Sequence, residues 1–403
     1  MSNPVFLRRV ILKNYKSIAS CSVNLGPLNF LVGANGAGKS NFLDALRFVS
    51  ESLNSSLDHA LRERGGIAEV RRRTSGRSGH PTHFRISLRF CLPDDTKGLY
   101  AFRVGSRKKG SFEVQEEECH VYKQALEERF FKVESGHVVD SKASVKTSVM
   151  PPASDDRLYL VAAAGLPDFR PIYDALFHMG FYNLNPDKIR ELQTPDAGEL
   201  LRRDGGNLAS VLDLMKKENK ISRQRVVEFL SKVVPGVQDV MVKRVGKKET
   251  LEFHQVGSNE TPWRFTAENM SDGTLRALGV LTALFQSANG GAKRIPLVGI
   301  EEPEMAVHPG AAGVLRDALS TAAERTQVVA TSHSPDLLDD KSIHADSILV
   351  VLNVNGETEI GPLKETDRSA ILDHLCTAGE LLRTTKLEPD LQSSTPDLFE
   401  EMP

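Results

Sequence analysis

The chain has 403 residues and a formal net charge of −2, with 40% hydrophobic and 26% charged residues. This composition is typical of a globular protein with room for two or three domains. The near-neutral charge excludes a general positive field that would draw the whole chain onto nucleic acid. Basic residues interrupt the N-terminus and no apolar run is long enough to span a bilayer, so a cytoplasmic protein without a membrane segment is predicted.

The N-terminal segment reads as short strands that lead into a glycine-rich loop. Apolar runs predict four strands, at 5–7, 10–12, 21–25 and 28–32. The last strand runs into Gly-Ala-Asn-Gly-Ala-Gly-Lys-Ser at 33–40, which has the pattern G-x-x-x-x-G-K-[ST]. Apolar residues at helical spacing follow, and this strand–loop–helix context distinguishes a phosphate-binding P-loop from a chance glycine-rich turn.

The chemistry of a P-loop follows from its backbone. Loop N–H groups and the following helix N-terminus supply partial positive charge to phosphates. Lys39 would reach the β- and γ-phosphates of a nucleotide, and Ser40 would ligate Mg²⁺. The predicted nucleotide-binding residues of this segment are Gly33, Ala34, Asn35, Gly36, Ala37, Gly38, Lys39, Ser40 and Asn41.

The segment after the P-loop helix changes character twice. Residues 52–80 read as a helix followed by a mobile loop. Alternating apolar and polar residues over 82–132 predict an antiparallel meander. Residues 134–157 are rich in Ser, Lys, Val and Pro, and we expect them to form a flexible excursion.

The second half of the chain returns to longer elements. Helical periodicity over 168–232 is followed by a short β segment over 237–254. The stretch 268–362 alternates helix and strand, as a parallel sheet with crossover helices does. The acidic, proline-containing tail from Glu388 is predicted to be disordered.

Two apolar strands of this second half end in polar residues. Residues 295–304 read Ile-Pro-Leu-Val-Gly-Ile-Glu-Glu-Pro-Glu, the Walker B arrangement of a strand followed by acids. Glu301 would hold Mg²⁺, directly or through water, and Glu302 would polarise an attacking water as a general base or orienting group. His333 ends the next strand, where its imidazole can donate a hydrogen bond to a γ-phosphate or to that water.

A further anion site is predicted at 271–273. Ser271, Asp272 and Gly273 precede an apolar helix, whose free N–H groups can bind an anion. The same residues suit a helix N-cap, with Ser271 as the cap and Asp272 in the first turn. Both roles can hold together.

These motifs together resemble the ABC-type ATPase heads. Ser271-Asp272-Gly273 matches the signature motif, Glu301 and Glu302 match the Walker B acids, and His333 matches the switch histidine. The set is most similar to the RecF-like and SMC-like branch, and within it to stand-alone AAA-family ATPases of bacterial anti-phage and OLD-type systems. Two positions depart from the common pattern: Glu301 stands where most members have Asp, and His308 stands in place of the D-loop Asp. Gln193 is the candidate for the Q-loop.

The resemblance implies an α/β fold: a P-loop NTPase of ABC-ATPase type, with a mixed sheet, an antiparallel β subdomain and a helical insertion. It implies ATP and Mg²⁺ as cofactors and ATP hydrolysis with Glu302 and His333 as catalytic residues. It also implies a homodimer, because signature residues of one subunit complete the ATP site of the other. A separate effector protein is the expected further partner. The expected layout is lobe I with the P-loop and antiparallel subdomain at 1–165, a helical insertion at 166–265, lobe II with signature, Walker B and histidine at 266–365, and a C-terminal helix with an acidic tail at 366–403.

Several functions are compatible with these motifs. The first is a switch ATPase that controls an effector, in anti-phage defence by resemblance. The second is a RecF/SMC-like ATPase that binds DNA in repair or genome maintenance, through basic stretches at 71–77, 107–109, 216–225 and 243–248. A small-molecule kinase or GTPase leaves the Ser-Asp-Gly segment unexplained, and a non-hydrolysing scaffold conflicts with the acids at 301 and 302.

Overall fold

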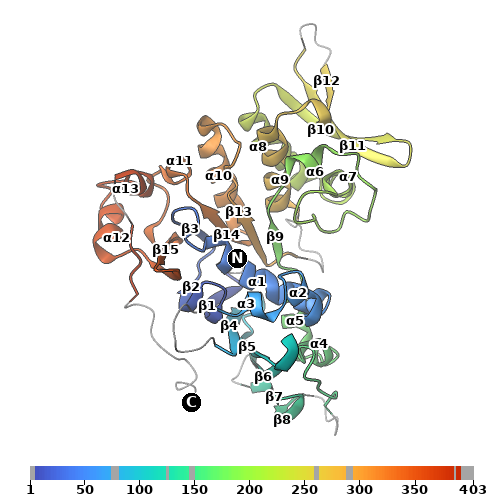
Figure 1. The fold of residues 1–403 in the computed structure, drawn as a ribbon. Coiled ribbons are helices and arrows are strands. Elements are labelled where there is room, and N and C mark those ends of the chain that lie inside the picture. The colour runs from blue at the N-terminus through green and yellow to red at the C-terminus, as the bar shows by residue number, and fades with distance from the viewer. Residues whose placement is uncertain are drawn as a thin grey trace.

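The computed structural model describes residues 5–73, 81–123, 127–144, 150–257, 263–286, 294–384 and 387–391. Their strands form three sheets, and the seven-stranded and three-stranded sheets lie at opposite ends of the molecule (Figure 1). The predicted α/β class with a mixed sheet and an antiparallel β subdomain is confirmed. None of the helices in these ranges is long and apolar enough to cross a membrane.

A six-stranded mixed sheet lies at the centre. Its order is β16-β15-β3-β14-β13-β9. All its neighbouring strands are parallel except for the antiparallel β15–β16 hairpin. The strands are β3 (Leu28–Val32), β9 (Gly180–Tyr182), β13 (Leu297–Glu301), β14 (Gln327–Ser332), β15 (Ile348–Val354) and β16 (Glu357–Pro362). The alternation of helix and strand over 268–362 is therefore confirmed.

The central sheet separates two hydrophobic cores because successive side chains of a strand point to opposite faces. Leu31 of β3 and Val329 of β14 belong to the core shared with α1 (Lys39–Asn54) and the seven-stranded sheet. Phe30 and Val328, one residue earlier, belong to the core shared with α9 (Asp272–Phe285) and α10 (Ala312–Ala323). The central strands are apolar almost throughout because both of their faces are buried. Such short apolar runs are what predicted these segments as strands.

The seven-stranded antiparallel sheet confirms the predicted meander over 82–132. Its order is β2-β1-β4-β5-β6-β7-β8. The strands are β1 (Leu7–Tyr15), β2 (Ile18–Asn24), β4 (His83–Cys91), β5 (Lys97–Ser106), β6 (Phe112–Lys123), β7 (Glu127–Glu134) and β8 (His137–Lys142). The structure corrects two details: residues 7–15 form a single strand in place of the two short ones, and 137–142, within the expected flexible excursion, pair with β7.

A cluster of charged side chains around Asp44 links α1 to β1 and to the residues that follow α2 (Leu57–Arg62). Asp44 accepts hydrogen bonds from the Tyr15 hydroxyl (2.8 Å) and the Arg64 guanidinium (Nε at 3.0 Å and Nη2 at 2.9 Å). Lys16 Nζ lies 2.6 Å from the same carboxylate, and Arg47 also donates to it. Burial acts to raise the pKa of Asp44, but the hydrogen bonds and charges of Arg64 and Lys16 outweigh it and hold the pKa well below its usual range.

The predicted helical region over 168–232 contains four helices and the short strand β9. The helices between the P-loop helix and this region are short, and two more follow β16. The remaining helices are α2 (Leu57–Arg62), α3 (Ile67–Val70), α4 (Leu160–Ala163), α5 (Arg170–Phe177), α6 (Pro186–Arg190), α7 (Leu208–Glu218), α8 (Lys220–Val233), α11 (Pro335–Leu338), α12 (Glu365–Leu372) and α13 (Ala378–Thr384).

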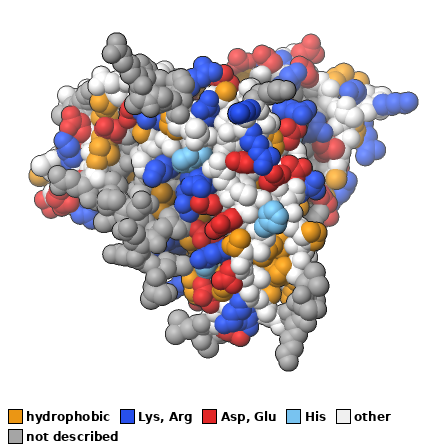
Figure 2. Space-filling view, turned by 60° about the horizontal axis from the view of Figure 1, so that its bottom comes forward, with side chains coloured by type: hydrophobic (Ala, Val, Ile, Leu, Met, Phe, Trp, Pro, Cys, Tyr) orange, Lys and Arg blue, Asp and Glu red, His pale blue; other side chains and the backbone are white. Residues whose placement is uncertain are grey.

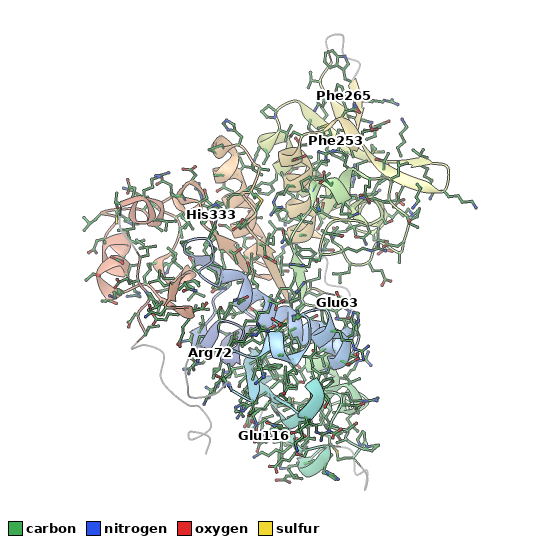
Figure 3. All side chains as sticks on the ribbon, viewed as in Figure 1. Glu63, Arg72, Glu116, Phe253, Phe265 and His333 are labelled. Atoms are coloured by element: carbon green, nitrogen blue, oxygen red, sulfur yellow. The ribbon has the colours of Figure 1, made fainter. Side chains whose placement is uncertain are left out.

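The β segment predicted over 237–254 is a three-stranded sheet that rests on these helices. Its strands are β10 (Val237–Val245), β11 (Lys248–Gln255) and β12 (Trp263–Thr266). Phe253 and Phe265 face each other across β11 and β12, and both lie on this sheet in Figure 3. The expected loop at 74–80 and the tail beyond residue 391 lie outside the described residues.

Candidate functional site

Three predicted motifs meet at one edge of the central sheet. The P-loop follows β3, His333 follows β14, and Glu301 ends β13, and these three strands are parallel neighbours. Ligands of open α/β sheets bind outside the carboxyl ends of the strands, which is this edge. Figure 3 shows His333 there, above the P-loop helix α1.

The P-loop forms a tight turn around the side chain of Lys39. The Lys39 ammonium donates to the carbonyl oxygens of Gly33 (2.7 Å) and Ala34 (3.0 Å) and is almost fully buried. Burial lowers the pKa of Lys39, against the charges of Glu302 and Glu304, which raise it. The parallel pairing of β3, β14 and β13 brings the Walker B region and the P-loop to the same sheet edge.

A contact from the last strand of the sheet fixes the shape of the loop. Gly38 has φ of +105°, and a Cβ there would lie 2.0 Å from Thr358 Oγ1. The Thr358 hydroxyl donates to Ala37 O at 2.9 Å and lies 2.6 Å from Ser17 Oγ. Asn41 Nδ2 donates to the same Ser17 oxygen at 2.6 Å. Asn41 thus supports the loop through Ser17, and sequence reasoning missed Thr358 because it lies more than 300 residues away.

The catalytic candidates Glu302 and His333 are in contact. His333 Nδ1 lies 3.2 Å from Glu302 Oε1. Glu302 has a positive φ of +45°, which non-glycine residues seldom adopt, and its N–H donates to Thr331 O at 3.1 Å. Backbone strain of this kind persists where the surrounding structure over-determines it, as it does at functional sites.

The neighbouring acids have other partners. Glu301 Oε1 accepts a hydrogen bond from Arg203 at 2.8 Å. Glu304 Oε1 accepts one from the Ser332 hydroxyl at 2.6 Å, while its buried Oε2 has no partner among the described residues. Glu301 would therefore share its carboxylate between Arg203 and a metal.

Arg276 links the Walker B turn to helix α9, and sequence reasoning missed it. Its guanidinium is buried and donates to Glu301 O (3.0 Å), Glu302 O (3.1 Å) and Leu184 O. Burial lowers the pKa of Arg276, and the three nearby carboxylates act in the opposite direction. An arginine on the apolar side of a helix, five positions after Ser271, was the available signal.

Replacing Arg276 with methionine should loosen this turn. The carbonyl oxygens of Glu301 and Glu302 would lose charge-assisted donors, at a cost of about 1.5–3 kcal/mol in the free energy of unfolding. The backbone of Glu302 would lose its fixed position, so we expect ATP turnover to fall at least about tenfold with little change in ATP affinity. Urea denaturation, nucleotide titration and phosphate release measure the three quantities; unchanged turnover would contradict the positioning role.

Residues 271–273, the predicted signature segment, lie at the N-terminus of helix α9. Ser271 Oγ accepts a hydrogen bond from Thr274 N (3.3 Å), as the predicted N-cap requires, and Asp272 pairs with Arg190. A Cβ on Gly273 would lie 2.2 Å from Ala306 O, so this glycine packs against the D-loop region of its own chain. Among the described residues, no hydrogen bond joins residues 271–273 to the P-loop.

The Q-loop candidate is not available for a nucleotide. Gln193 is buried, donates to Ile189 O (3.3 Å) and Gly205 O (3.4 Å), and accepts from Ala209 N (2.9 Å). All its amide groups therefore stabilise the helical region. The residue that follows β9, next to the strand of Glu301, is the exposed Asn183.

The residues at the sheet edge fit a magnesium nucleotide. The exposed loop tip at 34–36, the positive φ of Gly36 and Gly38, and the Lys39 ammonium are the groups that receive phosphates in a P-loop. The described residues hold no cluster of three or more His, Cys, Asp or Glu side chains that could bind a metal by itself. Mg²⁺ usually completes its shell with waters and substrate phosphates, so Ser40 and Glu301 would suffice on the protein side.

Comparison with known families agrees with this geometry. Residues 28–339 match a family described as "AAA domain, putative AbiEii toxin, Type IV TA system". The chain belongs to this AAA family. Comparison with curated proteins gives no match. As a P-loop ATPase family, its members generally use ATP and Mg²⁺.

Solved structures show that this AAA-family chain has the fold of an SMC head. One is "Crystal structure of the SmcHead bound to the C-winged helix domain of ScpA", with 13% identity, a TM-score of 0.57, and coverage of 90% of this chain and 99% of that chain. Another is an Smc head domain with an extended coiled coil, bound to the C-terminal domain of ScpA from Pyrococcus furiosus. It has 12% identity, a TM-score of 0.58, and coverage of 92% and 99%. The resemblance to ABC-type heads of the SMC-like branch is thereby confirmed.

Proposed function

We propose that this AAA-family chain is an ATP-hydrolysing switch that dimerises around ATP and controls a separate effector. Glu302 takes a proton from, or orients, the attacking water, and His333 holds Glu302 and the γ-phosphate region. Lys39 and the loop N–H groups bind the phosphates, with Mg²⁺ held by Ser40 and Glu301 to neutralise charge. ATP bridges two heads, so its binding favours the closed state and hydrolysis releases it.

The observation that carries the dimer is the position of the signature segment. Ser271 is exposed at the N-terminus of the 14-residue helix α9, and the described part of the chain shows no hydrogen bond between it and its own P-loop. A helix N-terminus of this kind stabilises an anion. The P-loop of a second copy would bring one.

Ser271→Asp tests this proposal without removing the helix cap. Aspartate caps a helix as well as serine does, but its charge repels a γ-phosphate. We expect the wild type to sediment as a dimer with a non-hydrolysable ATP analogue and as a monomer with ADP, and the variant to remain monomeric with both. ATP should still bind each variant monomer. A variant that dimerises like the wild type would refute the composite site.

The role in anti-phage defence rests on the matched family, whose description names a toxin of a type IV toxin–antitoxin system. A host carrying the complete native locus should resist phage, and Glu302→Gln in that locus should change resistance or host growth. The SMC heads were solved with ScpA, and by analogy a partner protein docks on this head. If neither phage plating nor growth depends on the ATPase site, the defence role is wrong.

DNA binding remains the second candidate, and local charges bear on it. Many cations of the basic stretches have in-chain partners: Arg72 pairs with Glu357, Arg107 with Glu113 and Asp155, Lys217 with Asp213, and Lys243 with Glu252. On the face in Figure 2, basic and acidic side chains are interspersed in small groups. Cations of the hairpin β10–β11 that have no ion-pair partner among the described residues, such as Arg244, favour DNA most. Duplex binding with a steep salt dependence that Arg244→Glu reduces would support this function.

A further inference from the structure

We propose a second anion site, on the seven-stranded sheet, that binds a small phosphorylated ligand such as a mononucleotide. A cavity of about 550 Å³ lies at the end of this sheet where β4 ends and β5 begins. Its lining includes Arg8, Arg89, Lys97, Phe90 and Tyr122, and no carboxylate. This volume lies within the usual range for small-molecule sites.

The strand register gathers the cations on one face. Arg9 lies opposite Arg89, and Lys97 lies opposite both Cys91 and Tyr122. Because side chains two residues apart share a face, Arg89 and Lys97 lie on the same side of the sheet as Tyr122. Arg8 is the extra residue of a β-bulge between Leu7 and Arg9, a feature that redirects a side chain and occurs often beside functional sites.

This arrangement places several positive charges together without a carboxylate of the described residues in the lining. Like charges directly opposite each other on neighbouring strands destabilise a sheet. Burial lowers the pKa of Arg9, and the charge of Arg89 lowers it further. The side chains of Arg8, Arg89 and Lys97 form no hydrogen bond or ion pair with the described part of the chain. An anion bound between Arg8, Arg89 and Lys97 would offset the positive charge of these three side chains.

The carboxylate that contacts Tyr122 already has two partners. Glu128 Oε1 accepts from the Tyr122 hydroxyl (3.0 Å) and lies 2.8 Å from His120 Nδ1. Its hydrogen bond to His120 lowers the pKa of Glu128, so Glu128 is ionised and compensated by the imidazole. Glu128 therefore holds Tyr122 in place at the rim of the cavity.

The side chains select the class of ligand. Arginine binds phosphate through two parallel N–H groups, and lysine adds a point charge. Tyr122 provides aromatic surface beside these cations, which suits a ring attached to the phosphate. The cations converge on one cavity and do not form a row, which favours a discrete nucleotide over a nucleic-acid strand.

Calorimetric titration of AMP into the full-length Lys39→Ala protein tests the site. This variant is used because it lacks the P-loop lysine, so that binding of AMP at the P-loop does not obscure binding at the second site. We expect binding that Arg89→Glu weakens at least about tenfold, which corresponds to about 1.4 kcal/mol. Arg244→Glu is the matched control, since it makes the same charge change on the exposed hairpin β10–β11 and should leave AMP binding unchanged.

The unfolding temperature gives a second measure of binding that does not depend on the heat of binding. Arg89→Glu places a carboxylate opposite Arg9, so it should raise the unfolding temperature without ligand, while AMP should raise that of the parent only. Equal AMP affinity in parent and Arg89→Glu proteins would overturn the site. Binding of a 12-nucleotide single strand without binding of AMP would overturn the ligand class. ATP hydrolysis by the wild type is a separate measurement, so either proposal can fail alone.

Discussion

Glu302→Gln should slow ATP hydrolysis by about 10²–10⁴-fold while ATP still binds. The amide keeps the size of the side chain and can still contact His333, but it cannot accept a proton from water. Because hydrolysis opens the dimer, the variant should also accumulate as an ATP-bound dimer. Phosphate release under saturating ATP measures the rate, and sedimentation measures the dimer.

The matched control for this variant is Glu324→Gln. Glu324 is exposed beyond the end of α10, and its replacement makes the same chemical change away from the sheet edge. Turnover of this control should equal that of the wild type. If Glu302→Gln hydrolyses ATP at the wild-type rate, Glu302 is not the catalytic carboxylate that activates water.

Asp44→Asn should produce the largest loss of stability, about 3–5 kcal/mol in the free energy of unfolding. The change removes one of the two carboxylates that pair with Arg64, whose side chain is only 3% exposed, and leaves Glu51, 2.7 Å from Nη1, as the remaining partner of this buried charge. Lys16 would lose the same partner. Urea denaturation at pH 7 measures the loss. Asp58→Asn is the control: its carboxylate forms an exposed i,i+4 pair with Arg62, so it should cost less than about 0.5 kcal/mol.

The same carboxylate predicts how stability depends on pH. Arg64 and Lys16 lower the pKa of Asp44 in the folded protein below its value of 3.8 in the unfolded chain. The stabilisation is therefore fully present above about pH 4–5 and is lost as the pH falls below it. Between pH 5 and pH 3 the wild type should lose more stability than Asp44→Asn. Parallel curves for the two proteins would show that Asp44 is not held ionised by its neighbours.

Local patterns were enough to predict the parts of the site that lie within one segment. The P-loop, the Walker B acids and the N-cap at Ser271 each depend on a few consecutive residues, and β3, β13 and β14 are apolar on both faces. The parallel order of these strands then brings Glu302 and His333 together.

Contacts between distant segments could not be predicted in this way. Thr358 reaches the P-loop only because β16 folds back along β15, and nothing near Thr358 in the sequence signals a phosphate site. Gln193 shows the reverse error: it was the candidate for the Q-loop, but its amide group is hydrogen-bonded within the helical region. Residues 7–15 form one strand because pairing with both β2 and β4 overrides the polar residues in the middle.

Mixing two inactive proteins tests the composite ATP site most directly. Lys39→Ala lacks the P-loop lysine and Ser271→Asp lacks a working signature, so each alone should hydrolyse no ATP. In a mixed dimer, one of the two sites combines Lys39 of one copy with Ser271 of the other, so activity should return, up to about half of the wild-type value when every dimer is mixed. The contradicting result is a mixture that stays as inactive as its components although both proteins fold and bind one another. In that case neither chain completes the ATP site of the other.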